Sequence, residues 1–235
     1  SPDMNYSMIS YILGWIFNFE AAFMILPGIT AIIYREKNGL AFLITMLICL
    51  TIGIPLTRRK RKSKVFHAKE GAVTVALSIA GALPFIISGS IPHPIDAIFE
   101  TVSGFTTTGA SILNNVEALS HCMLIWRSFT HWIGGMGVLV FILCLLPLTG
   151  GYHMNLMKAE SPGPSVSKLV PKVQSTAKIL YTIYIILTIV EIIFLLIGKM
   201  PLFDTLCLSF GTAGTGGFGI KNDSMGSYST YCQIV

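Results

Sequence analysis

Charged side chains are scarce in this sequence: they make up 11% of the residues, against about 25% in a typical soluble domain. Hydrophobic residues reach 53%, and the mean hydropathy is +0.71. Charge this sparse cannot cover a globule of 235 residues in water. The composition therefore excludes a soluble protein, and the long apolar runs described below predict an all-α integral membrane protein.

Recognisable catalytic and metal-binding motifs are also missing. The sequence contains no HExxH, nucleophile elbow or phosphate-binding loop, so it predicts neither an enzyme nor an organic cofactor. The cysteines are odd in number and show no CxxC spacing, and the histidines share no spacing that suits a metal or a catalytic base. We interpret both sets as packing or interface residues: Cys49, Cys122, Cys144, Cys207 and Cys232, and His67, His93, His121, His131 and His153.

Long apolar runs dominate the rest of the chain. A bilayer core requires about 20 apolar residues in a helix, and several stretches come near that length. The stretch at 72–91 is interrupted by Gly81, Pro84 and Gly89 and lies close to the lower limit. The predicted spanning helices cover residues 8–33, 40–57, 72–91, 122–147 and 177–198.

Basic residues gather in two of the connecting segments. Seven of the 16 Lys and Arg residues lie between Arg58 and Lys69, and the segment 148–176 carries further lysines. Because cytoplasmic loops are enriched in Lys and Arg, we expect both segments and the N-terminus to face the cytoplasm of a multi-pass protein in the cell membrane. The run RRKRK has no aromatic or groove-binding element beside it, so we expect no nucleic-acid partner.

Two shorter segments, 94–111 and 201–219, are too brief and too rich in Gly, Thr and Ser to span a bilayer. Each begins at a proline and follows a predicted spanning helix. Irregular backbone at membrane depth is tolerated only inside protein or beside a water-filled cavity, so we predict two re-entrant pore loops. They align without a gap, which pairs Thr107 with Thr215. Internal repeats of this kind are typical of transport folds.

The repeated unit is a spanning helix, a pore loop and a second spanning helix. The first copy is complete, and the second is cut off after its loop. The predicted organisation is an N-terminal two-helix hairpin (4–57), a basic cytoplasmic loop (58–71), a first repeat (72–147), a cytoplasmic linker (148–176) and a second, truncated repeat (177–235).

The second loop carries the pattern Thr-x-Gly-aromatic-Gly of potassium-channel filters over 215–219, and the first loop is a degenerate relative. In such filters, inward-pointing backbone carbonyls replace the water shell of the ion. Successive carbonyls share a direction only if ordinary and left-handed conformations alternate. Glycine reaches the left-handed region without steric cost, and we assign this role to Gly109 and Gly217.

The predicted potassium ligands are mainly backbone carbonyls, and the only metal expected is potassium at these positions. A competing interpretation is that the Gly-Thr runs are flexible loops or helix-packing faces. The ligand residues are Thr107, Thr108, Gly109, Ala110, Thr215, Gly216, Gly217 and Phe218.

Charged residues at membrane depth are costly and are functional candidates by default. We expect Arg127 to pair with Glu100 on the first pore helix and to brace the filter from behind. A proton relay through Glu20, Glu100 and Glu191 is the alternative. The glycines at 134, 135 and 137 favour close helix packing, with a hinge for pore opening as the second interpretation.

Four motifs carry a family resemblance: FETVSGFTTTGAS over 99–111, WRSFTHWIGGMGVLVF over 126–141, AESPGPSVSKLVPKVQSTAKILYTIY over 159–184 and GTGGF over 214–218. With the N-terminal hairpin, they resemble the Trk/Ktr/HKT superfamily of potassium transporters, most closely its TrkH branch. The resemblance implies four pore-loop repeats around one pore and a homodimer in the lipid bilayer. It also implies a cytoplasmic ring of nucleotide-binding regulatory subunits.

The sequence therefore predicts potassium transport across the cell membrane through a carbonyl-lined selectivity filter, with potassium as the transported ion. Two alternatives remain. One is a pathway for sodium or mixed monovalent cations, and the other is a membrane scaffold that transports nothing.

Overall fold

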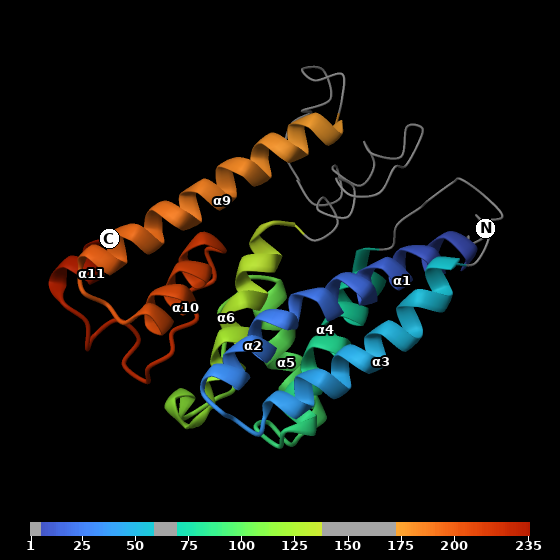
Figure 1. The fold of residues 1–235 in the computed structure, drawn as a ribbon, viewed down its shortest axis with the longest axis horizontal. Helices are drawn as coiled ribbons and strands as arrows, with labels where there is room; N and C mark the ends of the chain where they lie inside the picture. Colours follow the sequence, from blue (N-terminus) through green and yellow to red (C-terminus); the bar gives the residue numbers. More distant parts are fainter. Residues whose placement is uncertain (1–5, 59–69, 138–172) are drawn as a thin grey trace.

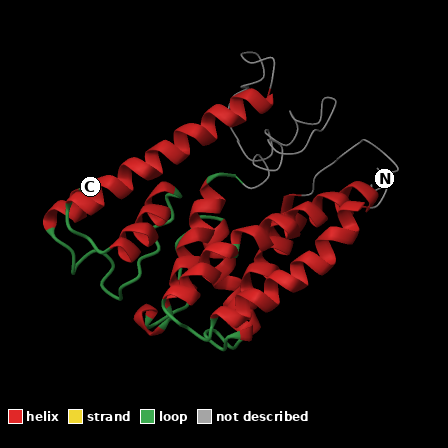
Figure 2. Cartoon of the chain, in the orientation of Figure 1, coloured by secondary structure: helices red, strands yellow, loops and turns green. Residues whose placement is uncertain are grey.

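The computed structural model describes residues 6–58, 70–137 and 173–235. Every regular element in these ranges is helical, and none of the described residues forms a strand (Figures 1 and 2). This confirms the predicted all-α fold. In chain order the helices form an N-terminal hairpin, a first helix–loop–helix unit and a second unit.

The N-terminal hairpin packs two spanning segments against each other. Both Ser10–Ile33 and Gly39–Arg58 are long and apolar enough to cross a membrane. The first is divided at Met24, where the sequence predicted one continuous helix. Pro27 explains the break, since a proline inside a helix has no N–H for the carbonyl four residues earlier and its ring crowds that carbonyl. The helices are α1 (Tyr6–Phe23), α2 (Ile25–Ile33) and α3 (Gly39–Arg58).

The first unit follows the hairpin. Its entering helix ends at Ile87 rather than at the predicted residue 91, and Gly89 turns the chain with a φ of 72°. Its leaving helix ends at Gly135, where the sequence predicted a continuous helix to residue 147, and Gly137 turns the chain with a φ of 71°. Residues 138–147 lie outside the described residues. The elements are α4 (Glu70–Ile87), α5 (Pro94–Phe105), a 3₁₀ turn η1 (Val116–Ala118) and α6 (His121–Gly135).

The second unit begins with the longest described helix. Its segment Ala177–Ile197 is apolar enough to span a membrane, and only 11% of its most apolar 18-residue stretch is buried. Lys199, with a φ of 62°, ends this helix, and Pro201 opens the next one. The elements are α9 (Val173–Ile197), α10 (Leu202–Ala213) and α11 (Thr230–Ile234).

Helix α6 lies at the centre of the structure, between the N-terminal hairpin and α10 (Figure 1). It packs against α2, α5 and α10, and all its residues from Cys122 to His131 are buried. Trp126 is fully buried and donates its indole N–H to the carbonyl of Gly81 in α4 at 3.0 Å. Because three parts of the chain meet on α6, its position determines where the two loops sit.

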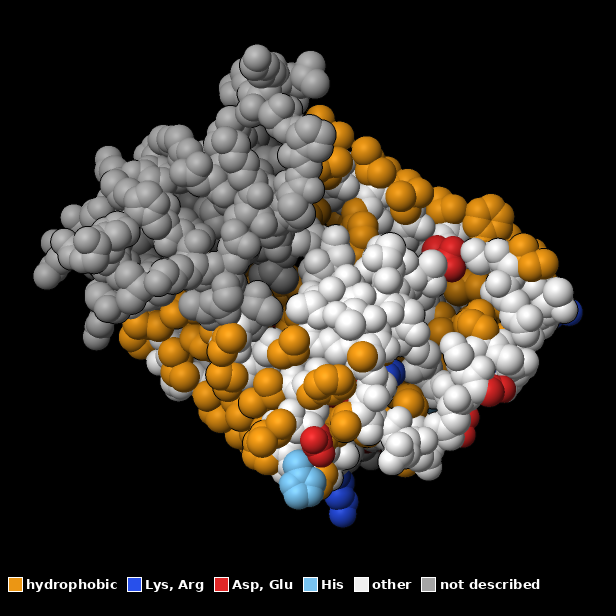
Figure 3. Space-filling view, turned by 180° about the vertical axis from the view of Figure 1, so that it is seen from behind, with side chains coloured by type: hydrophobic (Ala, Val, Ile, Leu, Met, Phe, Trp, Pro, Cys, Tyr) orange, Lys and Arg blue, Asp and Glu red, His pale blue; other side chains and the backbone are white. Residues whose placement is uncertain are grey.

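The outer surface is largely apolar. Figure 3 shows hydrophobic side chains spread over much of the described surface on that face. On α9 alone, Ile179, Leu187 and Ile197 are each at least 60% exposed. Apolar surface on this scale suits lipid or further protein rather than water. It agrees with the membrane protein predicted from the composition.

Candidate functional site

The two short helices begin and end at equivalent positions of the two aligned loops. Helices α5 and α10 are each 12 residues long, and their bounds follow from the gapless alignment that pairs Thr107 with Thr215. Pro94 is the first residue of α5, and Pro201 is the N-cap of α10. Proline suits a helix start because the first amides have no acceptor within the helix. The repeat found in the sequence is therefore also a repeat of the backbone.

Helix α5 ends in a left-handed turn. The amides of Thr107 and Thr108 donate to the carbonyls of Gly104 and Ser103 at 3.1 and 3.0 Å, and Thr107 has a φ of 55°. This is a Schellman motif, whose left-handed position is usually glycine. A residue with a side chain costs about 1–2 kcal/mol in that conformation, so the surroundings must hold Thr107 in place.

Helix α10 ends in the same way. The amides of Thr215 and Gly216 donate to the carbonyls of Thr212 and Gly211 at 2.9 and 3.0 Å, and Thr215 has a φ of 56°. Sequence reasoning did not assign a left-handed conformation to either threonine. No local signal could have found it, because the residue type itself disfavours that conformation.

Two residues beyond each threonine comes a second left-handed position. Gly109 and Gly217 have φ angles of 76° and 80°, as the sequence predicted for these two glycines. Both loops therefore place left-handed residues at the same alternating positions. Alternation of this kind is what allows successive carbonyls to turn toward one side.

The two loops lie side by side. A Cβ atom built on Gly109 would overlap the carbonyl oxygen of Gly216, so no larger residue fits at 109 without displacing the second loop. A Cβ atom on Gly217 would meet no atom within 4 Å among the described residues. Gly109 is therefore a contact point between the loops, whereas Gly217 borders open space.

Glu100 holds the first loop. Its side chain is 1% exposed, on the buried face of α5. One carboxylate oxygen accepts from the hydroxyl of Ser111 at 2.8 Å, and the other accepts from the amide of Ile112 at 2.9 Å. The first oxygen also accepts from Nε of Arg127 at 2.6 Å. The carboxylate therefore fixes the chain directly beyond the predicted ligands of the first loop.

Arg127 holds the second loop. Its Nη1 donates to the carbonyl of Gly219 at 2.8 Å, and its guanidinium carbon lies 3.6 Å from the centre of the Phe218 ring. The hydrogen bond and the cation–π contact both favour a positively charged side chain at position 127. The ion pair predicted between Glu100 and Arg127 is present, and it joins the two loops through one buried contact.

His131, which the sequence assigned to packing or to an interface, packs against the second loop, a partner that the sequence did not predict. Its ring is fully buried and stacks on Phe218, with centroids 4.0 Å apart and planes inclined by 20°. A Cβ atom on Gly216 would overlap this ring, so the imidazole lies directly against the second loop. His131 follows Arg127 by one helical turn, which a sequence pattern alone does not connect to Phe218.

The structure brings all eight predicted ligand residues into these two adjacent segments. Their side chains differ in environment: Phe218 is buried, whereas Thr108, Ala110 and Thr215 are exposed. In the first segment the hydroxyls of Thr106 and Thr108 lie 2.8 Å apart. The segments share the backbone conformation at both aligned pairs, Thr107 with Thr215 and Gly109 with Gly217, although the exposure of their side chains differs.

Two glycines of α6 make room for both loops. A Cβ atom on Gly134 would overlap the carbonyl of Phe105, the last residue of α5. A Cβ atom on Gly135 would lie 2.6 Å from the Cα atom of Gly214, just after α10. This supports the close-packing interpretation of the glycine run.

Glu20, another charge at membrane depth, makes no hydrogen bond to Glu100 or Arg127. Glu20 is 1% exposed in α1, and neither of its carboxylate oxygens has a hydrogen-bond partner among the described residues. An atom placed at the Cβ position of Gly81 would lie 2.9 Å from it, which locates Glu20 against α4. Within the described ranges, no group of three or more His, Cys, Asp or Glu side chains could hold a metal ion.

Comparison with known proteins assigns this arrangement to a family. The model of the family TrkH, described as a cation transport protein, matches residues 39–235. The chain belongs to the TrkH family. One curated relative is the Trk system potassium uptake protein TrkH of Salmonella typhimurium, 39% identical over 235 residues, or 97% of this chain and 49% of the relative. The protein of the same name from Escherichia coli K12 is 38% identical over the same shares.

A solved TrkH structure has the same fold. The crystal structure of the potassium transporter TrkH from Vibrio parahaemolyticus aligns with 98% of this chain at a TM-score of 0.79 and 29% identity. The alignment covers 48% of that chain. This chain therefore spans about half the length of the TrkH relatives it matches. Those relatives are named as transporters, in agreement with the absence of enzyme motifs.

Proposed function

We propose that this chain forms part of a potassium uptake pathway in the cell membrane. In this pathway, backbone oxygens of two adjacent loops replace part of the water shell of the ion. The observation that carries the proposal is the matched backbone of the loops, with left-handed residues at Thr107 and Gly109 and again at Thr215 and Gly217. Potassium transport is also the activity named for the TrkH relatives.

The proposed ligands are the backbone carbonyls of residues 107–110 and 215–218, with the threonine hydroxyls of the first positions as additional oxygens. Potassium filters coordinate the dehydrated ion with stacked rings of such oxygens. Two loops cannot surround an ion, so the proposal includes further loops in the full-length protein that carries this chain. The TrkH family resemblance implies four.

The helix directions favour a cation beside the loops. Helices α5 and α10 both run toward their loops, so their C-terminal ends place roughly half a negative charge each near the proposed path. Asp96 and Asp204 lie in the first turns, at the opposite, positive ends. Neither helix has a side-chain cap, so these aspartates complement the helix charge without capping the helix.

Neighbouring groups offset the positive charge of Arg127, so this side chain repels a nearby cation only weakly. Its guanidinium contacts the Glu100 carboxylate, a backbone carbonyl and an aromatic face. A buried pair of this kind is close to neutral as a whole. The proposal therefore assigns Glu100 and Arg127 to filter support rather than to ion binding or a proton relay.

The proposed topology places the basic segments 58–71 and 148–176 in the cytoplasm, together with the N-terminus. The hairpin tip at 34–38 and the stretches that leave the two loops then lie at the extracellular end. A homodimer and a cytoplasmic nucleotide-binding regulatory subunit belong to the same proposal. They rest on the TrkH resemblance alone.

The test is ion uptake by the full-length protein in liposomes. We expect uptake of rubidium, a potassium substitute, that potassium suppresses and that an equal concentration of sodium leaves nearly unchanged. Equal suppression by both ions would favour a mixed-cation pathway. Absence of any protein-dependent uptake, in protein shown to be folded by its cooperative thermal unfolding, would favour a membrane scaffold and overturn the proposal.

A further inference from the structure

The tip of the N-terminal hairpin caps a helix of the first pore unit. Glu36 lies in the turn between α2 and α3, and its carboxylate oxygens accept from the amides of His121 and Cys122 at 2.8 and 3.0 Å. These are the first two residues of α6, whose own N-cap, Ser120, makes no side-chain capping bond. The first amides of a helix have no partner within it, and a carboxylate suits the positive end. The first turn of α6 is therefore capped from the hairpin.

The turn that presents Glu36 is well defined. Helix α2 ends in a Schellman motif, in which the amides of Arg35 and Glu36 donate to the carbonyls of Ile32 and Ala31 at 3.2 and 2.9 Å. Arg35 occupies the left-handed position with a φ of 54°. This geometry points the chain toward α6 before the next helix begins.

Two further contacts attach the tip to α6. Nδ2 of Asn38 donates to the hydroxyl of Ser120 at 2.9 Å. The Tyr34 ring stacks on His121, with centroids 3.9 Å apart and planes inclined by 3°. The tip therefore contacts α6 through a carboxylate, an amide and an aromatic ring.

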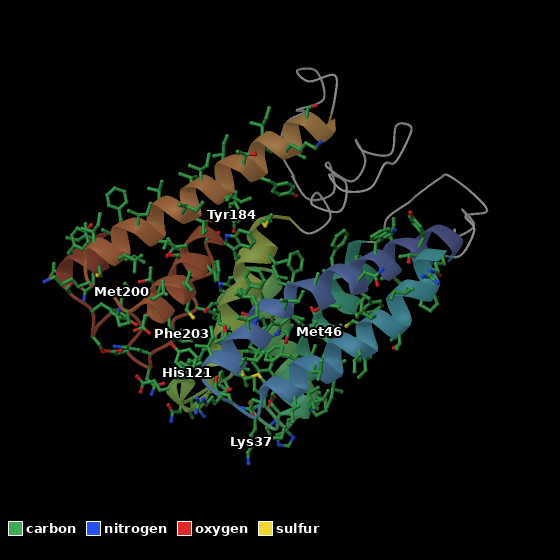
Figure 4. All side chains as sticks on the ribbon, viewed as in Figure 1. Lys37, Met46, His121, Tyr184, Met200 and Phe203 are labelled. Atoms are coloured by element: carbon green, nitrogen blue, oxygen red, sulfur yellow. The ribbon has the colours of Figure 1, made fainter. Side chains whose placement is uncertain are left out.

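The same cluster reaches the second pore unit. Phe203, the second residue of α10, meets the rings of Tyr34 and His121 edge-on at 5.6 and 4.8 Å. Figure 4 shows His121 and Phe203 close together near the end of the molecule where Lys37 marks the hairpin tip. One aromatic cluster thus joins the hairpin, α6 and the pore helix of the second unit.

We propose that Tyr34, Glu36 and Asn38 of the hairpin tip (residues 34–38) form a clamp that sets the position of α6 relative to α10, and that Glu36 is its central positioning residue. Further along the same helix, α6 carries Arg127 and Gly134, which hold or contact the loops. A displacement at the start of α6 therefore moves the supports of both loops together. This inference rests on the proposed function, because the effect we expect concerns ion selectivity.

The experiment compares variants of the full-length protein in liposomes, each normalised to folded protein. Glu36→Ala removes both acceptor oxygens and is expected to raise the sodium-to-potassium uptake ratio by about threefold or more, because the first amides of α6 lose their cap and this end of the helix can shift. Glu36→Gln keeps one acceptor and should give a smaller rise. Tyr34→Ala should raise the ratio, whereas Tyr34→Phe, which keeps the ring, should leave it unchanged.

Lys37→Ala is the matched control. Lys37 is the neighbouring residue in the same turn, its side chain is exposed, and Figure 4 shows it at the tip, away from the cluster. We expect wild-type selectivity from this variant. A selective wild-type protein whose Glu36→Ala and Tyr34→Ala variants remain equally selective, even if less heat-stable, would overturn the clamp and leave the proposed function intact. An unselective wild-type protein would instead remove the proposed function itself.

Discussion

In the first helix–loop–helix unit a carboxylate within the unit holds the chain beyond the loop, whereas the second unit depends on a guanidinium from the first. Glu100 binds Ser111 and Ile112 directly, and Arg127 reaches across to Gly219. The gapless alignment pairs Glu100 with Leu208, so the second unit has an apolar residue where the first has its carboxylate. The two backbones are alike, but a single ion pair supports both.

The comparison shows how a repeated backbone can depend on an unrepeated contact. The turns after α5 and α10 are built from local hydrogen bonds, which any copy of the unit can form. The chain beyond the turn has no helix to direct it and needs a partner from elsewhere. Because one buried pair serves both loops, the largest effects are expected from changes to that pair.

The largest effect is expected when Glu100 is replaced by leucine, the residue that the second unit has at the aligned position 208. Glu100→Leu leaves the Arg127 guanidinium buried without its carboxylate, which should cost about 3–5 kcal/mol of unfolding free energy. Potassium selectivity should be lost as well, because Ser111 and Ile112 lose their acceptor. Thermal unfolding in detergent and rubidium uptake with sodium competition measure the two effects.

The double variant Glu100→Leu with Arg127→Val separates support of the loops from general stability. Replacing both members of a buried ion pair by apolar residues is often nearly neutral for stability. We expect much of the unfolding free energy to return while selectivity stays lost. Leu208→Met, at the aligned position of the second unit, is the control and should change both by little. Restored selectivity in the double variant would contradict the assigned role of the pair.

An intermediate effect is expected at the two left-handed glycines, and it should differ between the units. Gly109→Ala combines a strained positive φ with overlap onto the Gly216 carbonyl, so it should displace the second loop and reduce potassium selectivity, though by less than Glu100→Leu does. The methyl group of Gly217→Ala would point into open space. This variant therefore has only the conformational free-energy cost of a positive φ, about 1–2 kcal/mol. It should therefore reduce selectivity by less, as measured by sodium competition with rubidium uptake.

D-alanine at position 217, introduced by semisynthesis, sharpens this prediction. A D-residue favours positive φ, so it removes the strain but keeps the methyl group. We expect near-normal selectivity from this protein. An equal loss of potassium selectivity with L- and D-alanine would show that the added methyl group, and not the backbone conformation at position 217, impairs the loop.

The smallest effect is expected from two left-handed residues that end helices in the second unit. Lys199→Gly, at the exposed end of α9, should stabilise the protein by up to about 1 kcal/mol and leave ion uptake unchanged. Thr215→Gly should relieve a similar strain but also remove a hydroxyl beside the proposed path, so it should alter selectivity. The melting temperatures and the sodium-to-potassium uptake ratios of the two variants test whether the turn after α10 differs from an ordinary helix end.

The sequence was most informative where residue type and spacing alone determine the outcome. The apolar stretches at Gly39–Arg58 and Ala177–Ile197 are helices, and α5 and α10 coincide with the gapless match of the two loops. The positive φ at Gly109 and Gly217 was predicted because glycine is the residue that adopts it most easily. A charge at membrane depth needs a partner, which is why the pairing of Glu100 with Arg127 could also be predicted.

Other features were not predicted from the sequence, and the reasons differ from one feature to the next. Thr107 and Thr215 adopt a conformation that their residue type disfavours, and the hydrogen bonds of the helix end hold them there. The carboxylate of Glu36 caps a helix that begins far along the chain. Pro27 divides a helix that apolar character alone predicted to be continuous.

The sequence by itself determined that this is a helical membrane protein with two matched loops, because hydrophobicity, glycine and proline act through the residues next to them. Only the tertiary structure decided that Arg127 contacts the second loop as well as Glu100, and that the hairpin tip contacts both helix–loop–helix units. The physical reason is the same in both cases. A buried charge or an unpaired helix end selects its partner by distance in space, and that distance exists only after the helices have packed.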